Sequence, residues 1–410
     1  LLLVFGRKIY QRFSPLLLFL TLFTALFPIA YVIVRGSTLY DGWRHLLFAY
    51  LPLVALVAVS WSYVIDLFKQ NTSGDKTTDT TMIKNYPAIR YAAIGILTLT
   101  AVEPAWFILN NKDYPYVYFN PLAGGIQSAF GSYETDYWGT SMQTAMEWLE
   151  QEGIVGDNMT DTVVIASNFS YQLDRYFQKK YDGKVKTTYV RFRQRYDKPW
   201  NYGLFLSRFV RGSHLSNNTW PPVDKTIHTI NANDVPLVAI MKEDDNATYR
   251  AVQAGKREDS KRVIELMERE VVKYPNNEIA WLELAKAYTN LGEAQLAYDA
   301  VERVLELEPE NVQAANLLGL NLINEGKVER GLRVFQNSLT FEPRNFIAHF
   351  YIGSVLAYQN RLDEAYVHAK ECIELNRKFP QAYELMANVL DKQGKTEQAA
   401  QYRRRAARLK

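Results

Sequence analysis

The fold of the C-terminal part of the chain is decided by residues 275–309, which read PNNEIAWLELAKAYTNLGEAQLAYDAVERVLELEP. The pattern recurs every 34 residues, since prolines stand at Pro275, Pro309 and Pro343. Turn residues and small residues keep the same period, at Gly292, Gly326, Asn360 and Gly394 and at Ala285, Gly319, Gly353 and Ala387. A fixed period of this length predicts a stack of helix pairs over residues 255–410.

The period and the residue types resemble the tetratricopeptide repeat. About four units are expected, with a single leading helix over residues 260–273 packed on the first. The resemblance implies an all-α solenoid that offers protein partners a concave face. This face is predicted to be lined by Leu282, Lys286, Asn316, Leu320, Phe350, Ser354, Glu384 and Asn388.

The N-terminal part, residues 1–110, holds three apolar runs, at about residues 15–34, 46–68 and 91–109. Each is long enough to cross a hydrocarbon core as a helix. The bias of Lys and Arg among the short connections places the loop after the first run, and everything after the third, outside the cytoplasm. We therefore expect a multi-pass protein of the bacterial inner membrane whose residues 111–410 are extracytoplasmic.

The connection between the first two runs carries polar and aromatic side chains, Tyr40, Asp41, Trp43, Arg44 and His45. Tyrosine and tryptophan in such a loop anchor it at headgroup depth, and arginine and histidine face water. A loop that lines a membrane-facing site is the alternative. The chain opens on Leu1-Leu2-Leu3-Val4-Phe5 without a charged segment before it, so we expect further sequence upstream.

The middle part, residues 111–250, is predicted to be a small α/β domain, because strand-like and helix-like runs alternate in it. Helices are expected from Ser141, as a helix N-cap, and over residues 171–181. A hairpin is expected across Asn233-Asp234. Strands are expected at residues 116–119, 162–166, 187–192, 202–209, 226–231 and 235–241.

Carboxylates and aromatic rings are densest at Glu134, Asp136, Tyr137 and Trp138. Rings that stack on a sugar face, beside carboxylates that accept from its hydroxyls, suit sugar binding. The same residues suit a domain that rests on a lipid headgroup layer. The sequence leaves both interpretations open.

Composition excludes several classes of site. The net charge of +3 is dispersed and indicates no nucleic-acid partner. The one cysteine, Cys372, excludes internal disulfides and cysteine-rich metal centres. The sequence has no phosphate-binding glycine loop, and its histidines lack metal-ligand spacing. No cofactor is identified and no metal ligand is assigned, with a divalent metal left open.

Two stretches resemble the bacterial polytopic glycosyltransferases of the GT-C class, of the dolichyl-phosphate-mannose and aminoarabinose transferase type. The first is LYDGWRHLLF at residues 39–48, and the second is YPYVYFNPLAGG at residues 114–125, followed by YETDYWG at residues 133–139. Trp220-Pro221-Pro222, before the predicted hairpin, is also similar to that group. The resemblance covers about residues 15–245. It implies sugar transfer from a polyprenyl-phosphate donor on the extracytoplasmic side, with Arg44 and His45 beside the donor phosphate. The catalytic acid of such enzymes lies in an earlier loop, and no residue of this sequence takes its place.

Two functions follow as hypotheses. The first is the C-terminal part of a membrane glycosyltransferase whose substrate is a lipid-linked sugar and whose repeats bind a protein. The alternative is a non-catalytic scaffold, anchored in the membrane, whose repeats recruit an envelope complex. A transporter subunit has little support.

Overall fold

The computed structural model describes residues 14–35, 49–59, 87–181 and 183–409. The chain divides into two compact units, residues 1–105 and 106–410. The predicted loop of residues 40–45 lies outside the described residues, as do parts of the second and third predicted spans.

The first unit contains α2 (Pro15–Arg35), an apolar helix at Ala49–Val59, and most of α5 (Pro87–Asn110). Within the described ranges, α2 alone is long and apolar enough to cross a membrane, by length and composition. A helix of this kind near the N-terminus can be an anchor or a signal sequence. The described residues thus show one candidate membrane helix, where the sequence predicted three spans.

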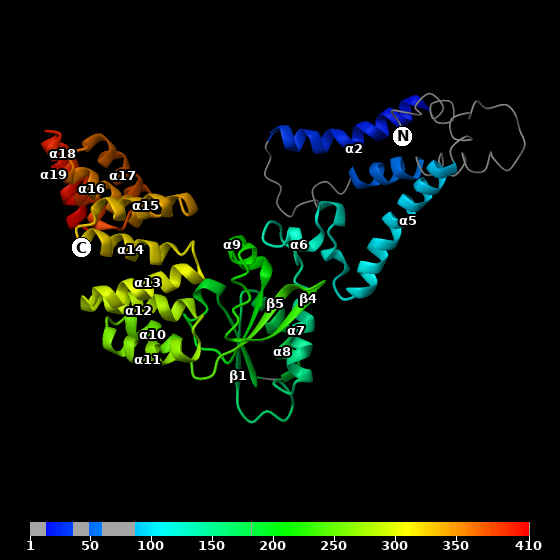
Figure 1. Ribbon diagram of the computed structural model, residues 1–410, viewed down its shortest axis with the longest axis horizontal. Helices are drawn as coiled ribbons and strands as arrows, with labels where there is room; N and C mark the ends of the chain where they lie inside the picture. Colours follow the sequence, from blue (N-terminus) through cyan, green and yellow to red (C-terminus); the bar gives the residue numbers. More distant parts are fainter. Residues whose placement is uncertain (1–13, 36–48, 60–86, 182, 410) are drawn as a thin grey trace, which may run out of the picture. The chain divides into compact units, whose positions relative to one another are not determined.

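The second unit begins with a five-stranded mixed sheet in the order β2-β1-β3-β5-β4. Strands β1, β2 and β3 are parallel, and β5 lies antiparallel to both β3 and β4. Figure 1 shows α7 and α8 beside the sheet. The bounds are α7 Ser141–Gln151, β1 Val163–Ser167, α8 Ser170–Tyr181, β2 Val185–Tyr189, β3 Tyr202–Leu206, β4 Thr226–Ala232 and β5 Val235–Lys242.

The strands β3 and β5 are apolar along nearly their whole length, which predicts burial on both faces. Leu204 and Leu206 of β3 pack under α7 and α8, together with Val238 and Ile240 of β5. Phe205 points to the opposite face, which is covered by the chain between β2 and β4. Partly buried side chains from the start of the helical array, Val252 and Ile279, pack against this second face.

Short helices complete the domain. The expected strand at residues 116–119 is wrong: Pro115 opens a 3-10 turn, η2 (Pro115–Val117), and a second turn, η3 (Pro121–Ala123), precedes α6 (Gly125–Ala129). Proline fixes φ near the helical value and favours such a turn. The strands expected at residues 187–192 and 202–209 end early, and 3-10 turns follow each of them. These turns and the last short helix are η4 (Phe192–Gln194), η5 (Ser207–Phe209) and α9 (Gly212–Ser216).

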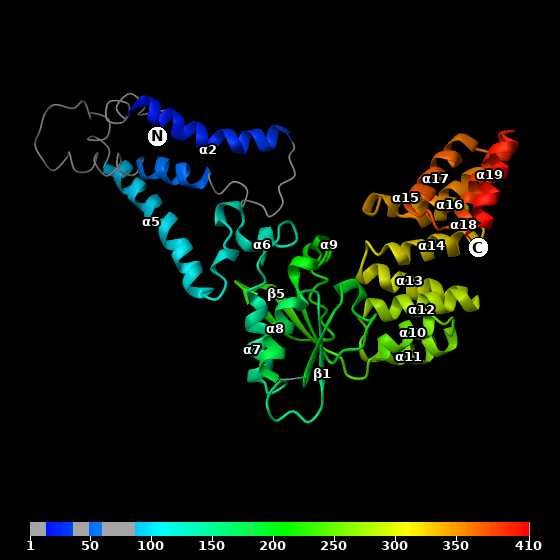
Figure 2. The ribbon, with the colours of Figure 1, turned by 180° about the vertical axis from the view of Figure 1, so that it is seen from behind.

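The helical array confirms the repeat prediction. Four antiparallel pairs follow one another, and Figure 2 shows them stacked from α12 to α19. The turn residues at Gly292, Gly326, Asn360 and Gly394 all have positive φ, as the register requires. The bounds are α12 Glu278–Leu291, α13 Ala294–Leu307, α14 Val312–Asn324, α15 Val328–Phe341, α16 Phe346–Tyr358, α17 Leu362–Leu375, α18 Pro380–Lys392 and α19 Thr396–Ala407.

The start of the array differs from the prediction of one leading helix. The structure has a pair, α10 (Ala247–Gly255) and α11 (Ser260–Lys273), that packs on α12. The buried face of α10 consists of alanines and a threonine, so no large apolar side chain marks this face in the sequence. The pairing of α10 with α11 is recognised only in the folded structure, where α10 packs on both α11 and α12.

Asparagine caps also keep the 34-residue period. The side chains of Asn277, Asn311 and Asn345 accept hydrogen bonds from the backbone N–H three residues on, at the starts of α12, α14 and α16. The fourth unit has Phe379 at this position and begins on Pro380 instead.

Candidate functional site

A groove at the start of the repeat array is built from two folds. Its first wall is the segment of residues 193–197, which follows β2 in the sheet domain and includes the end of η4. Its floor and second wall come from α10, α11, α12 and α14. The position of the groove therefore depends on how the sheet domain is joined to the repeats.

A buried arginine makes the first part of this joint. The Arg195 Nη2 donates to both carboxylate oxygens of Glu278, at 2.8 and 2.9 Å, and Glu278 is the first residue of α12. The guanidinium lies 4.5 Å from the ring centroid of Phe192. Burial by itself lowers the pKa of Arg195, but the charges and hydrogen bonds of Glu278 and Tyr196 together raise it and keep the guanidinium ionised. This carboxylate at a helix N-terminus is also favoured by the helix dipole.

A buried lysine makes the second part. The Lys225 Nζ lies 2.7 Å from the Glu243 carboxylate and 2.5 Å from that of Glu270 in α11. Burial would lower the pKa of Lys225, but its interactions with Tyr196, Glu243 and Glu270 raise it. All three charged groups are buried, and separating the ammonium from the two carboxylates would leave buried charges without partners, which is costly.

The third part lies at the end of α13. The His214 Nε2 is 2.9 Å from Glu308, and both side chains are largely shielded from water. Burial would raise the pKa of Glu308, but the hydrogen bond and charge of His214 lower it below its ordinary value. Asp224 accepts from the backbone and side chain of Asn276 at 2.6 and 2.9 Å. The sheet domain is thus held to the start of the helical array by several separate side-chain contacts.

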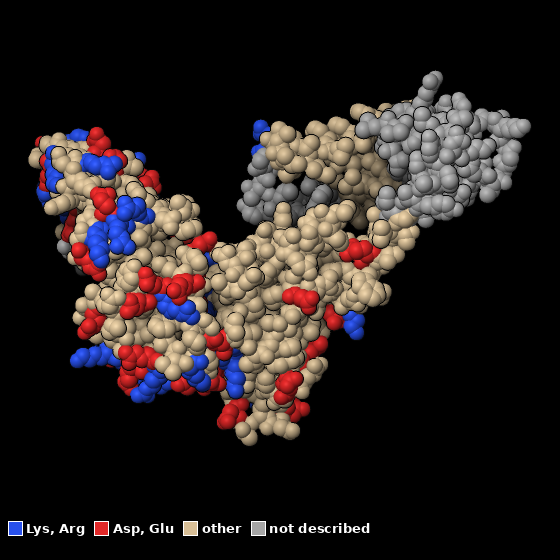
Figure 3. Space-filling view, in the orientation of Figure 1, with Lys and Arg blue, Asp and Glu red and all other residues tan. Residues whose placement is uncertain are grey.

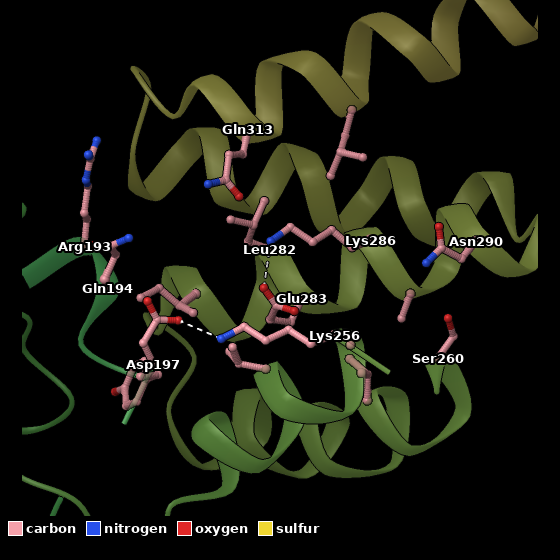
Figure 4. Close-up of a pocket in the computed structure, with 17 residues that line it drawn as sticks. Arg193, Gln194, Asp197, Lys256, Ser260, Leu282, Glu283, Lys286, Asn290 and Gln313 are labelled. Carbon is pink, nitrogen blue, oxygen red and sulfur yellow. Dashed lines mark hydrogen bonds and ion pairs between the residues drawn. The ribbon is translucent and has the colours of Figure 1, made fainter. Parts of the chain in front are cut away.

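The groove has a volume of about 540 Å³. Its apolar floor includes Leu282 of α12 and Leu317 of α14, and carboxamides stand around it at Gln194, Asn290 and Gln313. Figure 4 shows Leu282, Gln313 and Lys286 together at its centre. Carboxamides can donate to and accept from the backbone of a bound segment, and the leucines can cover apolar side chains.

Two ion pairs lie in the groove. The Lys256 Nζ, at the end of α10, is 3.2 Å from Asp197 of the sheet domain. The Lys286 Nζ is 2.7 Å from Glu283 one turn earlier in α12. Both pairs are drawn in Figure 4. The Lys256–Asp197 pair is exposed, and an exposed ion pair is weak and can be exchanged for contacts with a ligand.

Of the predicted concave residues, the structure brings Leu282 and Lys286 into this groove. Asn316 instead exchanges hydrogen bonds with Asn345, at 2.8 and 3.3 Å. Phe350 packs edge-on against Phe379, and the hydroxyl of Ser354 donates to the Phe350 carbonyl. The remaining three predicted residues, Leu320, Glu384 and Asn388, are half-buried or exposed and do not line this groove.

Sequence reasoning missed part of the lining. Ile279 and Gln313 are 34 residues apart, as are Glu283 and Leu317, so the repeat register could have supplied both pairs. Residues 193–197 carry no signal of this kind, because they reach the groove only through the joint with the sheet domain.

The four residues at 134–138 lie in the sheet domain before α7. The carboxylate of Asp136 is buried and accepts from the backbone N–H groups of Thr140 and Ser141, at 3.2 and 3.1 Å. It also bonds the Tyr116 hydroxyl. Burial raises the pKa of Asp136, although the bonds from Ser141 oppose the shift. Asp136 therefore serves the start of α7, and Thr140, rather than the predicted Ser141, is the N-cap residue.

Two of the other three members, Glu134 and Tyr137, contact Arg208. Its Nε lies 3.0 Å from Glu134, and its guanidinium carbon lies 3.9 Å from the centroid of the Tyr137 ring. Trp138 is 57% exposed and stands edge-on to Tyr137. A small cavity of about 160 Å³ is lined in part by Glu134 and Arg208. The described residues contain no group of three or more side chains suited to hold a metal ion.

Comparison with known proteins supports the repeat domain. The tetratricopeptide repeat family matches residues 279–311. A curated protein of Caenorhabditis elegans, "BBSome complex member bbs-4", is 32% identical over 111 residues, and the match covers 27% of this chain and 21% of that protein. The chain therefore matches about a fifth of that relative's length.

Two solved structures are similar over the same share of the chain. The crystal structure of MamA is 18% identical, with a TM-score of 0.34, and the match covers 39% of this chain and 93% of that one. MamA from Desulfovibrio magneticus RS-1 is 15% identical, with a TM-score of 0.35, and the match covers 40% of this chain and 92% of that one.

Proposed function

We propose that the tetratricopeptide repeats of this chain dock a segment of a partner protein in the groove between α12, α14 and residues 193–197. The observation that carries the proposal is the groove itself, with an apolar floor and carboxamide walls. The buried joint supports it, because Arg195 and Lys225 hold both walls in one geometry before a ligand arrives. The protein would be a scaffold held at the membrane by its N-terminal part.

Photo-crosslinking in cells tests this proposal. A photoreactive residue at Gln313 should give one crosslinked product whose partner is identified by mass spectrometry. The product should vanish when Leu317→Asp is added, because a carboxylate in the floor disfavours apolar contact. Lys370→Glu, an exposed change in α17 away from the groove, should leave it intact.

A photoreactive residue at Gln295, exposed on α13 outside the groove, is the matched control. The same product from Gln295, or its survival in the Leu317→Asp variant, would contradict docking in the groove.

The second candidate function is transfer of a sugar from a polyprenyl-phosphate donor, with the full protein as a multi-pass membrane enzyme and residues 111–410 extracytoplasmic. It rests on the resemblance of residues 39–48, 114–125 and 133–139 to the GT-C glycosyltransferases. The exposed ring of Trp138 favours it, because exposed aromatic rings suit a sugar face and Trp138 packs on Tyr137, whose ring contacts the Arg208 of the Glu134–Arg208 pair.

Sugar transfer from a lipid-linked donor by the full-length protein tests this second function. Arg44→Ala and Trp138→Ala should each lower turnover, the first through donor phosphate binding. Turnover equal to that of the unaltered protein in both variants would remove these residues from the reaction. Deletion of the repeats, with transfer intact, would separate the two functions.

A further inference from the structure

Twenty successive residues of the sheet domain, 114–133, carry no charge. They lie between Asp113 and Glu134. Figure 3 shows the surface around α6 almost without Lys, Arg, Asp or Glu. An exposed surface without charges, where it also carries large apolar side chains, marks a site of interaction with another protein, a ligand or a membrane.

Large apolar side chains of this segment and of the preceding helical turn face outward. Leu122 is 95% exposed and Tyr133 is 69% exposed. In the last turn of α5, Trp106 and Leu109 are exposed as well. Phe107, between them, is buried against Val117 and Tyr118 and fixes the turn to the segment. We call Trp106, Leu109, Leu122 and Tyr133 the apolar surface.

Leu122 is presented by a rigid turn. The Asn120 side chain accepts from the Leu122 N–H at 2.9 Å, and the Gly125 N–H donates to the Asn120 carbonyl at 3.1 Å. Gly124 adopts φ +92°, where a side chain would collide with Ser128. The turn is therefore built to hold a leucine away from the domain.

The segment beneath this turn is fixed to the hairpin of β4 and β5. Asn111 donates to the side chain of Asn233 at 3.0 Å, and Gln127 donates to the Asn233 carbonyl at 3.0 Å. Ile126 is buried against Val235 and Leu237. Leu122 is thus exposed although the segment beneath its turn is firmly packed on the hairpin.

Chemistry and chain order identify the occupant. The apolar surface continues directly from α5, a 24-residue helix whose last turn it includes. It combines aliphatic side chains with tyrosine and tryptophan, the mixture that lies at the boundary between lipid headgroups and acyl chains. We propose that the apolar surface rests on the lipid bilayer, with Leu122 inserted at headgroup depth. This inference does not depend on the groove or on sugar transfer.

Spin labelling of the full chain tests the contact. Cys372 is buried and is replaced by alanine, and a single cysteine is then placed at Leu122, where no packing is lost. The labelled protein is reconstituted in vesicles of phosphatidylethanolamine and phosphatidylglycerol. Collision with oxygen, which partitions into lipid, is compared with collision with a water-soluble nickel chelate. The control label stands at Val272 in α11, which is 84% exposed.

We expect the oxygen-to-nickel collision ratio at residue 122 to be several-fold higher than at residue 272 in the vesicles. Equal ratios at the two positions in vesicles would overturn the proposal. Protection from both reagents, with spin–spin coupling between labels, would overturn it too, because it would show a second copy of the chain on this surface.

Discussion

The joint between the sheet domain and the repeats differs in chemistry from the joints between successive repeats. The first is built from buried charges, with Arg195 on Glu278 and Lys225 on Glu243 and Glu270. The joints within the array are apolar, and small residues of the 34-residue register let the helices approach. One compact unit thus contains two kinds of joint, one held by buried charges and the others by apolar packing.

The difference has a physical reason. Successive repeats present similar faces to one another, so apolar packing in a fixed register is enough to stack them. A sheet and a helix pair have no common register. Buried charges can fix their orientation, because a charge without its partner is costly in the interior. The groove takes one wall from the sheet domain and one from the repeats, so its shape depends on the joint that is built from buried charges.

The largest expected effect breaks the ionic joint. Lys225→Met leaves Glu243 and Glu270 buried without a cation, and we expect a loss of about 3–5 kcal/mol in the free energy of unfolding. Lys242→Met is the control, since this lysine is exposed and 3.9 Å from Asp244, and should cost under about 1 kcal/mol. Denaturant unfolding followed by tryptophan fluorescence in detergent measures both. Equal losses would show that the joint does not depend on buried charge.

The next effect breaks an apolar joint. A Cβ at Gly319 would lie 2.6 Å from the Phe335 ring, so Gly319→Val should cost about 1–3 kcal/mol through overpacking. Gly353→Ala is the milder control, because its nearest contacts are 3.1 and 3.2 Å and alanine favours a helix. The same unfolding measurement applies. A larger loss for Gly353→Ala would contradict this account of the register.

A smaller effect concerns the repeated caps. Asn311→Ala removes the side chain that accepts from the Ala314 N–H at 3.0 Å, and should cost about 1 kcal/mol. Gln295→Ala, at an exposed position of α13, should change stability by less than about 0.5 kcal/mol. Hydrogen exchange should show faster opening at the start of α14 in the first variant alone. Unchanged exchange there would remove the cap from the stability of the repeat.

The smallest effect is a pH dependence within the third repeat. The Nδ1 atoms of His349 and His368 are 3.0 Å apart, a distance that requires at least one neutral ring. Burial, and then the charge of His349, lower the pKa of His368, against the opposing charge of Glu364. A histidine whose pKa is lowered by folding contributes stability above its unfolded pKa of about 6.5, and this is lost as pH falls below that value.

Thermal unfolding between about pH 8 and pH 5 measures this dependence. The drop in melting temperature on acidification should be smaller in His368→Gln than in the unaltered chain. A drop of the same size in both would assign the pH dependence to other groups.

Much of the fold could be predicted from patterns that act over short distances. The buried face of α7, with Met142, Ala145, Met146 and Leu149, was expected from helical spacing and is confirmed. The hairpin across Asn233 and Asp234 is confirmed, with positive φ at both residues. The strand predicted at residues 116–119 is wrong, because Pro115 and Pro121 each open a 3-10 turn in spite of the alternating pattern.

The candidate site was predictable only in part. Leu282 and Lys286 follow from the repeat register, and both line the groove. Asp136 was expected to contact a sugar or a headgroup, whereas its carboxylate is buried against the start of α7. The sequence does not distinguish a carboxylate that binds a ligand from one that accepts hydrogen bonds from the first N–H groups of a helix. The residues at 40–45 stay a prediction.

The sequence by itself determined the repeat array, because a period of 34 residues places every helix, turn and small residue relative to its neighbours. It also determined the order of the main elements of the middle domain, α7, β1, α8, β2, β3, β4 and β5. Only the tertiary structure decided which side chains share the groove, since residues 193–197 meet α12 through Arg195 and Glu278, 83 residues apart. Contacts between unlike folds leave no period in a sequence, and they depend on shape and charge that exist only after both have folded.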